Sequence, residues 1–113
     1  MSRTNKVMQL LGLARRAGAV APGTEAVRQA IRGGKARLVL FAGDASPVQL
    51  DKIGRTLHAR SVPRARLADR NKLGAAVGLA PLSAVAVTDA SLAEQVLVEL
   101  GDLLLDDSVA AEG

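Results

Sequence analysis

The sequence predicts an α/β protein: a three-layer α/β/α sandwich around a small mixed sheet of about four strands. Apolar residues recur at helical spacing in several segments, and two short apolar runs, 38–42 and 84–88, are typical of strands buried on both faces. Glycine, proline and capping residues separate these segments. Because helices and short buried strands alternate along the chain, we expect helices to cover both faces of one sheet.

The first half of the chain alternates helix and strand. Apolar residues at i, i+3, i+4 and i+7 predict a helix over 4–17, which Ser2 or Thr4 would cap and Gly18 would end. The elements that follow are a short extended piece at 19–21, a helix at 25–33 with Thr24 as its N-cap, and the buried strand at 38–42.

The second half continues the alternation. The predicted elements are a helix at 47–59 opened by Ser46 and Pro47, a strand at 64–67 near an edge of the sheet, a helix at 70–77 capped by Asp69 and ended by Gly78, and the strand at 84–88. A last helix starts at 89–91, where Ser91 and Glu94 have the spacing of a capping box, and its inner apolar stripe runs to Leu103.

The length of 113 residues is that of one domain, predicted over residues 1–105, with an acidic flexible tail at 106–113. The sequence has no cysteine and a single histidine, which excludes a thiol nucleophile and a cysteine or histidine-rich metal site, and no cofactor is expected. No segment resembles a signal peptide or a membrane span, so a cytoplasmic location is predicted.

Charge is segregated along the chain. Residues 1–72 contain all 15 lysines and arginines and four acidic residues, a net charge of +11, whereas residues 73–113 contain seven acidic residues and no base. Such asymmetry favours a polyanion as the partner of the first two thirds over a merely solvated basic surface. The single aromatic residue, Phe41, argues against nucleic-acid binding by a row of stacking aromatics.

A candidate anion site lies around residues 21–28. Pro22 and Gly23 predict a turn, and Thr24 begins a helix whose first backbone N–H groups would face an anion. Four basic residues follow on or just after this helix: Arg28, Arg32, Lys35 and Arg37. A capped helix with a solvated basic face is the plainer interpretation, but together with the charge segregation the pattern favours RNA or another phosphate chain.

Signals for catalysis are weak. His58 is the single histidine and lies on the polar side of its predicted helix, so we interpret it as a surface residue. Asp44 follows the first buried strand, at the position of a phospho-acceptor in receiver domains, but the acidic cluster that would bind Mg²⁺ there is missing. Asp44 is better interpreted as shaping its turn. No phosphate-binding loop motif is present.

An ordered series of short segments resembles the bacterial YlxQ-type branch of the kink-turn-binding ribosomal protein superfamily. The segments are LLGLARRAG at 10–18, GTEAVRQAI at 23–31, GKARLVLFAGDAS at 34–46, SVP at 61–63, KLGAAVG at 72–78 and AVAVTD at 84–89. The resemblance spans about residues 8–100 and implies the α/β/α fold and RNA binding without catalysis. It also implies structured RNA, of ribosomal or kink-turn type, as the partner, with translation proteins as further partners and no DNA specificity.

The resemblance also implies where RNA would bind. Gly23 and Thr24 match the family loop G-T-N-E-x-x-K, whose Asn, Glu and Lys contact sheared G·A pairs and the kinked backbone. At those three positions this chain has Glu25, Ala26 and Gln29. The implied RNA-binding residues are therefore Gly23, Thr24 and Glu25, the phosphate-binding Arg28, Arg32, Lys35 and Arg37, and a second contact at Gly78, Leu79 and Ala80.

Two of these residues have further expected roles. Glu25 is expected to pair with Arg28 or to stabilise the helix N-terminus as an acid of the first turn. Leu79 would pack on an extruded base, unless the segment is a plain turn.

Two other functions compete with RNA binding. In the first, the acidic last helix or the basic face binds a protein of the translation machinery without specific RNA binding. In the second, the chain is a small enzyme or nucleotide sensor that uses Asp44.

Overall fold

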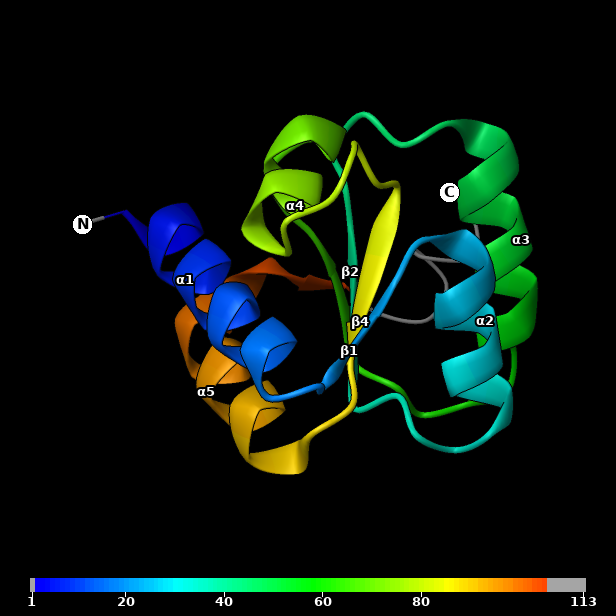
Figure 1. Cartoon of the computed structure of the whole chain (residues 1–113). Helices are drawn as coiled ribbons and strands as arrows, with labels where there is room; N and C mark the ends of the chain where they lie inside the picture. Colours follow the sequence, from blue (N-terminus) through cyan, green and yellow to red (C-terminus); the bar gives the residue numbers. More distant parts are fainter. Residues whose placement is uncertain (1, 106–113) are drawn as a thin grey trace.

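The structure, a computed structural model, describes residues 2–105 and arranges them around one sheet (Figure 1). Its helices are α1 (Arg3–Arg16), α2 (Thr24–Arg32), α3 (Pro47–Leu57), α4 (Arg70–Ala76) and α5 (Ala90–Leu100), followed by a 3₁₀ turn at Gly101–Leu103. Its strands are β1 (Val20–Pro22), β2 (Leu38–Phe41), β3 (Arg64–Arg66), β4 (Ala84–Val87) and β5 (Leu104–Leu105). α1, α4 and α5 cover one face of the sheet and α2 and α3 cover the other, which confirms the predicted three-layer sandwich (Figure 1).

The sheet is mixed, in the order β1-β4-β2-β3-β5. β2 and β3 are parallel, whereas β1 and β2 both run antiparallel to β4, and β3 runs antiparallel to β5. Residues Leu38 and Val39 of β2 lie opposite Val87 and Ala86 of β4. β1 and β2 therefore finish at the same end of the sheet, where β4 begins.

The fifth strand corrects the prediction for the C-terminal region. We expected the apolar stripe of the last helix to continue to Leu103, but α5 ends at Leu100 because Gly101 takes a φ of +53°. The chain then turns back, and β5 pairs with β3, with Leu104 opposite Ala65. β3 is therefore flanked on both sides in the described chain and is not an edge strand. The predicted acidic tail lies outside the described residues.

The core lies on both faces of the two central strands. Every residue of β2 and β4 is buried, which is why both segments are apolar at every position instead of alternating. Phe41 is buried, and full burial of such a side chain stabilises the fold by roughly 1.5–3 kcal/mol. The helices add further buried side chains to this core: Val7, Leu11, Val27, Ile31, Leu50, Ile53, Leu57, Leu73, Val96 and Leu100.

The helix starts confirm three predicted caps and correct two. The side chains of Ser2, Ser46 and Asp69 accept backbone N–H groups in the first turns of α1, α3 and α4. The prediction for Ser91 is wrong, because Asp89 Oδ1 accepts the N–H of Leu92 at 2.8 Å and the helix has already begun at Ala90.

The predicted N-cap of the second helix, Thr24, is also wrong. Thr24 is itself the first residue of α2, and Gly23 holds the N-cap position.

No helix in the described part of the chain is long and apolar enough to cross a membrane.

Candidate nucleic-acid interface

Gly23 forms a sharp turn between β1 and α2. Its φ of +91° and ψ of 161° lie in a region that is essentially restricted to glycine. The turn is held in place because the Gly23 N–H donates to the carbonyl of Ala84 at 2.9 Å. Among the helices of the described chain, α2 is the one whose first turn receives no side-chain cap. The backbone N–H groups of its first turn therefore have no side-chain acceptor from the N-cap, and Glu25 is the acid of this turn, near the positive end of the helix dipole.

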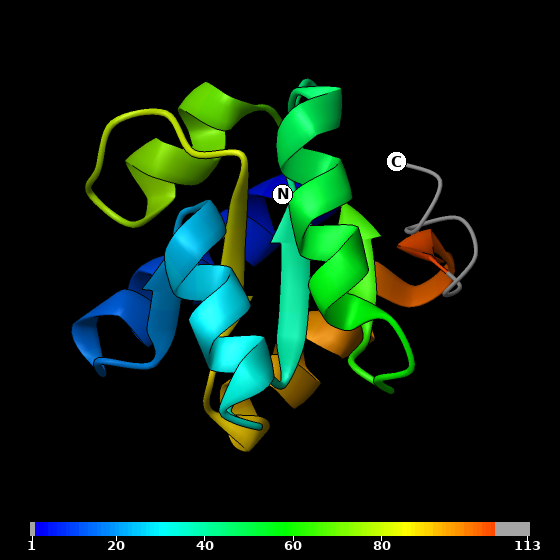
Figure 2. The same ribbon diagram turned by 90° about the vertical axis from the view of Figure 1, so that its right-hand side faces the viewer.

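The segment 77–83, which follows α4, lies beside this turn, as Figure 2 shows where the yellow-green loop approaches the start of α2. A Cβ atom on Gly23 would lie 3.7 Å from a methyl carbon of Leu82. The N–H of Leu82 donates to the Arg70 carbonyl at 3.1 Å, and the N–H of Leu79 donates to the Gly74 carbonyl at 2.8 Å. Leu79 is 40% exposed.

Gly74 makes this loop possible. It lies inside α4, and a Cβ atom there would come within 2.2 Å of the Ala80 carbonyl oxygen and 2.8 Å of the Leu79 carbonyl oxygen. The loop backbone therefore packs directly on the helix backbone. The structure brings together the Gly23 turn and the predicted second contact at Gly78, Leu79 and Ala80, and we call this end of the sheet the Gly23 end.

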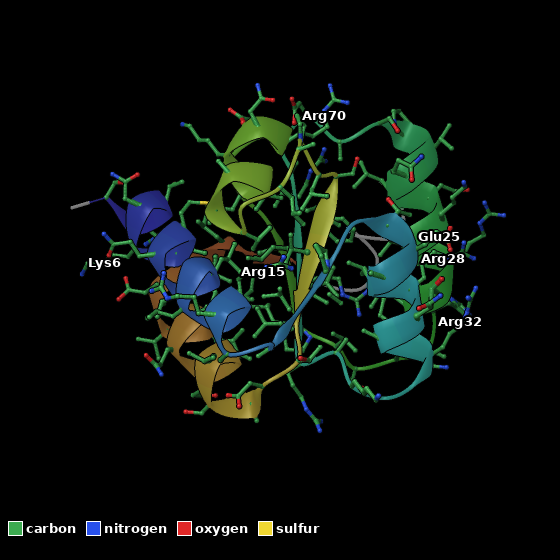
Figure 3. The ribbon with its side chains drawn as sticks, in the orientation of Figure 1. Lys6, Arg15, Glu25, Arg28, Arg32 and Arg70 are labelled. Carbon is green, nitrogen blue, oxygen red and sulfur yellow. The ribbon has the colours of Figure 1, made fainter. Side chains whose placement is uncertain are left out.

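Arg28 bridges α2 and α3. Its Nε donates to Thr56 Oγ1 at 3.0 Å, and its Nη1 lies 3.0 Å from Glu25 Oε1 (Figure 3). The expected pairing of Glu25 with Arg28 is confirmed. Only 22% of the Arg28 side chain is exposed, against 65% for Glu25, so Arg28 is a positioned guanidinium whose charge is partly balanced.

The other predicted cations lie toward the opposite end of the sheet. Arg37 donates its backbone N–H to Val87 at the end of β4, whereas Gly23 bonds to Ala84 at its start. α2 has nine residues, so Arg32 lies about 13 Å along the helix from the Gly23 turn. Arg32, Lys35 and Arg37 are exposed and make no ion pair within the described residues. The segment 22–37 therefore runs the length of the sheet and does not form one compact edge.

Asp44 and Arg70 form a contact at the Gly23 end that sequence reasoning did not find. Asp44 Oδ1 accepts the backbone N–H of Arg70 at 2.8 Å, and Arg70 Nε lies 3.5 Å from Asp44 Oδ2. The N–H bond, with the guanidinium charge, lowers the pKa of Asp44 below its ordinary value. We expected Asp44 to shape its own turn, but its carboxylate contacts the start of α4 instead. No signal in the sequence links these two residues, which are 26 positions apart. Because of this contact, Arg70 is a further cation at the Gly23 end.

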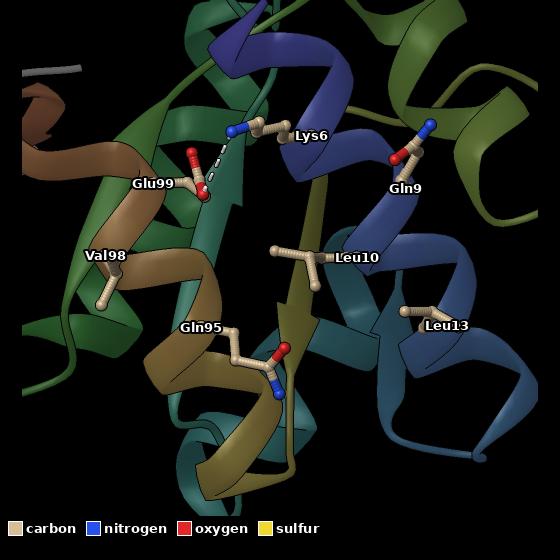
Figure 4. A pocket seen from close by; sticks show the side chains of 7 residues that line it. All are labelled: Lys6, Gln9, Leu10, Leu13, Gln95, Val98 and Glu99. Carbon is tan, nitrogen blue, oxygen red and sulfur yellow. Dashed lines mark ion pairs between the residues drawn. The ribbon is translucent and has the colours of Figure 1, made fainter. Parts of the chain in front are cut away.

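A groove lies between α1 and α5, on the face of the sheet opposite α2 and α3 (Figure 4). It has a volume of about 610 Å³, and its apolar part includes the exposed side chains of Leu13 and Val98. Lys6 Nζ and Glu99 Oε1 close one end at 3.9 Å. Within the described residues, no group of three His, Cys, Asp or Glu side chains is arranged to hold a metal ion.

Comparison with known proteins identifies the family. The model of the ribosomal protein L7Ae/L30e/S12e/Gadd45 family matches residues 5–97. The chain belongs to this family. It is also 36% identical over 88 residues to the RNA-binding protein YlxQ of Bacillus subtilis, a match that covers 78% of this chain and 88% of that protein.

Two solved structures have the same fold. A protein of unknown function from Bacillus halodurans has a TM-score of 0.78 and 28% identity, with 84% of this chain and 96% of that chain covered. The 15.5 kD RNA binding protein of Giardia lamblia has a TM-score of 0.75 and 21% identity, covering 89% of this chain and 87% of that chain. Of these relatives, YlxQ is an RNA-binding protein, and at 21% identity the Giardia likeness shows the fold alone.

Proposed function

We propose that the protein is a non-enzymatic RNA-binding protein that binds structured RNA of kink-turn type at the Gly23 end, in the cytoplasm and in association with ribosomal or translation RNA. The observation that carries this proposal is the juxtaposition of the uncapped start of α2 with the exposed Leu79 loop, in a chain of the L7Ae/L30e family. Family membership supports RNA as the ligand, and the geometry supports the Gly23 end as its binding site.

The Gly23 end offers three kinds of contact to RNA. Backbone N–H groups at the start of α2 suit a phosphate, and Gly23 has no side chain to hold the strand away. Arg70 adds a cation beside them. Leu79 offers an apolar surface on which an unstacked base can pack, as proteins that read bulges and internal loops require.

The chemistry at the three altered family positions predicts how the bases are read. Glu25 is engaged by Arg28 and so presents a paired carboxylate, Ala26 has no polar side chain, and Gln29 is exposed. Discrimination between bases therefore rests on the RNA shape and on backbone groups at Gly23 and Thr24. Affinity should depend steeply on salt, because phosphate contacts release counterions.

The test compares a kink-turn RNA with a plain duplex of equal length, between roughly 50 and 200 mM salt. We expect much tighter binding to the kink-turn. Leu79→Ser should weaken that binding roughly fivefold, because an apolar contact with a base is worth on the order of 1 kcal/mol. The matched control is Val98→Ser, which changes another exposed aliphatic side chain on the opposite face and should leave binding unchanged.

Other outcomes would decide against the proposal. Equal binding to both RNAs, with no effect of Leu79→Ser, would remove the kink-turn assignment and the loop contact together. Failure to bind any RNA at low salt would leave protein binding as the function. The groove between α1 and α5, with its exposed Leu13 and Val98, is the observation that favours this alternative.

A further inference from the structure

A basic hollow lies between α2 and α3, on the face of the sheet opposite α1. It has a volume of about 370 Å³ and contains no carboxylate in its lining. Glu25, Arg28 and Arg32 project from α2 toward α3, one below the other (Figure 3). The lining residues are Arg28, Arg32, Arg55, Thr56, His58 and Arg60.

A second hollow continues the first around the C-terminal end of α2. Its volume is about 410 Å³, and it shares Arg60 with the first hollow and adds Arg37. Its lining also contains no acidic residue. Together the two hollows form a strip that runs from Arg28 past Arg60 to Arg37, and we call it the α2–α3 groove.

Two guanidinium groups of the groove are held in place by hydrogen bonds. Arg28 is fixed by Thr56 and Glu25, and Arg60 Nη1 donates to the carbonyl of Ile31 at 2.9 Å. Each retains further N–H groups, because a guanidinium has five. A group that is already ordered loses less entropy when it binds a ligand.

Acidic residues near the groove leave its charge positive. Asp51 Oδ2 lies 2.8 Å from Arg55 Nη2, and Glu25 pairs with Arg28. Both acids are more than half exposed, at 60% and 65% of their side chains, so water screens them. Arg32 and Arg37 have no acidic partner in the described chain.

We propose that the α2–α3 groove binds the sugar–phosphate backbone of the duplex that extends from the RNA element held at the Gly23 end. This inference rests on the proposed function and extends it to a second site, with Arg55, Arg60 and His58 as residues not assigned before. Planar guanidinium forks match phosphate oxygens, and Thr56 and His58 provide further hydrogen-bonding groups beside them.

The composition of the hollow between α2 and α3 favours a nucleic acid over an acidic protein segment. Its lining has no apolar side chain that could anchor a peptide. The distance also fits, since the 13 Å or so from the Gly23 turn to Arg32 corresponds to roughly four base pairs. A stem shorter than this reaches the Arg28 part of the groove but cannot reach Arg32.

The test uses two kink-turn RNAs, one with a stem of about two base pairs and one with a stem of about eight on the side facing α2. The variant is Arg32→Gln with Arg55→Gln, both exposed helix positions. On the long RNA we expect about fivefold weaker binding and a salt slope smaller by about two, one for each lost phosphate contact. On the short RNA the variant should bind like the wild type.

The charge-matched control is Arg3→Gln with Lys6→Gln, which also removes two positive charges but on α1, across the sheet. It should leave both RNAs bound as before. Circular dichroism and thermal unfolding of each variant verify that the fold is kept.

Four results would overturn the inference. Equal effects of the two double variants on the long RNA would mean that only total charge matters. A poly-glutamate peptide that competes with the long RNA as well as an RNA of equal charge would assign the groove to acidic protein. A third result is that Arg32→Gln with Arg55→Gln leaves binding of the long RNA unchanged, while the short RNA is still bound selectively and its binding depends on Leu79. The groove is then not an RNA-binding site, but the proposed function stands. If the wild type binds neither RNA, both fail.

Discussion

The helical layers on the two faces of the sheet balance their positive charges in different ways. On the α1/α5 face, cations near the start of α1 pair across to acidic residues at the end of α5 and just beyond it. Lys6 Nζ lies 3.9 Å from Glu99 Oε1, and Arg3 Nη1 lies 3.3 Å from Asp102 Oδ1. This face is therefore close to neutral at that end, and its groove is apolar.

On the α2/α3 face, the ion pairs of the described residues stay within single helices and leave several exposed cations without an acidic partner. The pairs are Glu25–Arg28 in α2 and Asp51–Arg55 in α3. Arg32, Lys35 and Arg37 make no ion pair in the described chain. The basic first part of the sequence is thus partly neutralised by the acidic last part where α1 packs on α5. The excess of positive charge remains on the α2/α3 face. Segregation along a chain locates a polyanion site only after the acidic residues have been placed.

The largest expected effect comes from the helix that connects the two faces. α4 belongs to the α1/α5 side, and its loop reaches the start of α2. Gly74→Ala should lower the free energy of unfolding by about 3 kcal/mol, the upper part of the usual range for overpacking, because its Cβ would meet loop backbone that cannot move aside. Urea unfolding measures this.

Gly12→Ala is the control for Gly74→Ala, because its Cβ would lie 3.4 Å from the Ala76 carbonyl oxygen, at ordinary contact distance. It should change stability little. Unchanged stability and RNA affinity in Gly74→Ala would show that the loop does not depend on this close approach.

The next effect concerns the turn that opens α2. Gly23→Ala should cost about 1–3 kcal/mol, because alanine is strained at a φ of +91°. Gly33→Ala, at the other end of the same helix and with a φ of −80°, should be nearly neutral. Thermal unfolding of the pair measures the difference, and equal effects would contradict the requirement for glycine at the turn. RNA binding should fall with Gly23→Ala but not with Gly33→Ala.

A smaller effect tests the charge comparison directly. Glu99→Gln with Asp102→Asn frees the cations of α1, so non-specific RNA binding at low salt should strengthen roughly twofold to threefold. Glu94→Gln removes an acid of the same helix that makes no ion pair in the described residues, and it should have a weaker effect. Filter binding to a plain duplex distinguishes the two. Equal effects would mean that the pairs across α1 and α5 do not mask the cations.

The smallest effect is the pH dependence of Asp44. Its pKa is lowered from the ordinary 3.8, mainly by the backbone N–H of Arg70. The ionised carboxylate therefore stabilises the fold at neutral pH, and this contribution disappears as pH falls through the lowered pKa. Asp44→Asn should be less stable than the wild type near pH 7 and equal to it in strong acid. Urea midpoints between about pH 2 and pH 7 measure the difference, which should not persist at the acid end.

Local patterns predicted most of the fold. The apolar spacing, the two buried runs and the capping signals at Ser46 and Asp69 placed five helices and four strands within a few residues of their observed bounds. These features are predictable because each depends on neighbours in the chain. β5 was missed because the last helix was expected to run to Leu103, and only pairing with β3 makes the two leucines that follow a strand.

The candidate site was less predictable for the same physical reason. The Gly23 turn and the Leu79 loop were named from a resemblance, and their contact through Leu82 depends on how the strands are ordered. The link between Asp44 and Arg70 and the sharing of Arg60 by two hollows join residues far apart in the sequence. The basic residues between 22 and 37 were expected to act together as one RNA-binding edge. They do not, because α2 runs away from the Gly23 end and β2 runs back toward it, so the segment between them lies at the opposite end of the sheet.

The pairing of β5 with β3 bears on how the protein behaves at high concentration. An uncovered strand edge offers its backbone groups to a strand of another molecule and so promotes self-association. Here the outermost strands are short: β5 has two residues, and β1 has three and includes Pro22, which has no N–H to donate. A chain shortened to end before Leu104 would lose the cover over β3. Versions of this protein made for solution work should therefore keep the residues through Leu105.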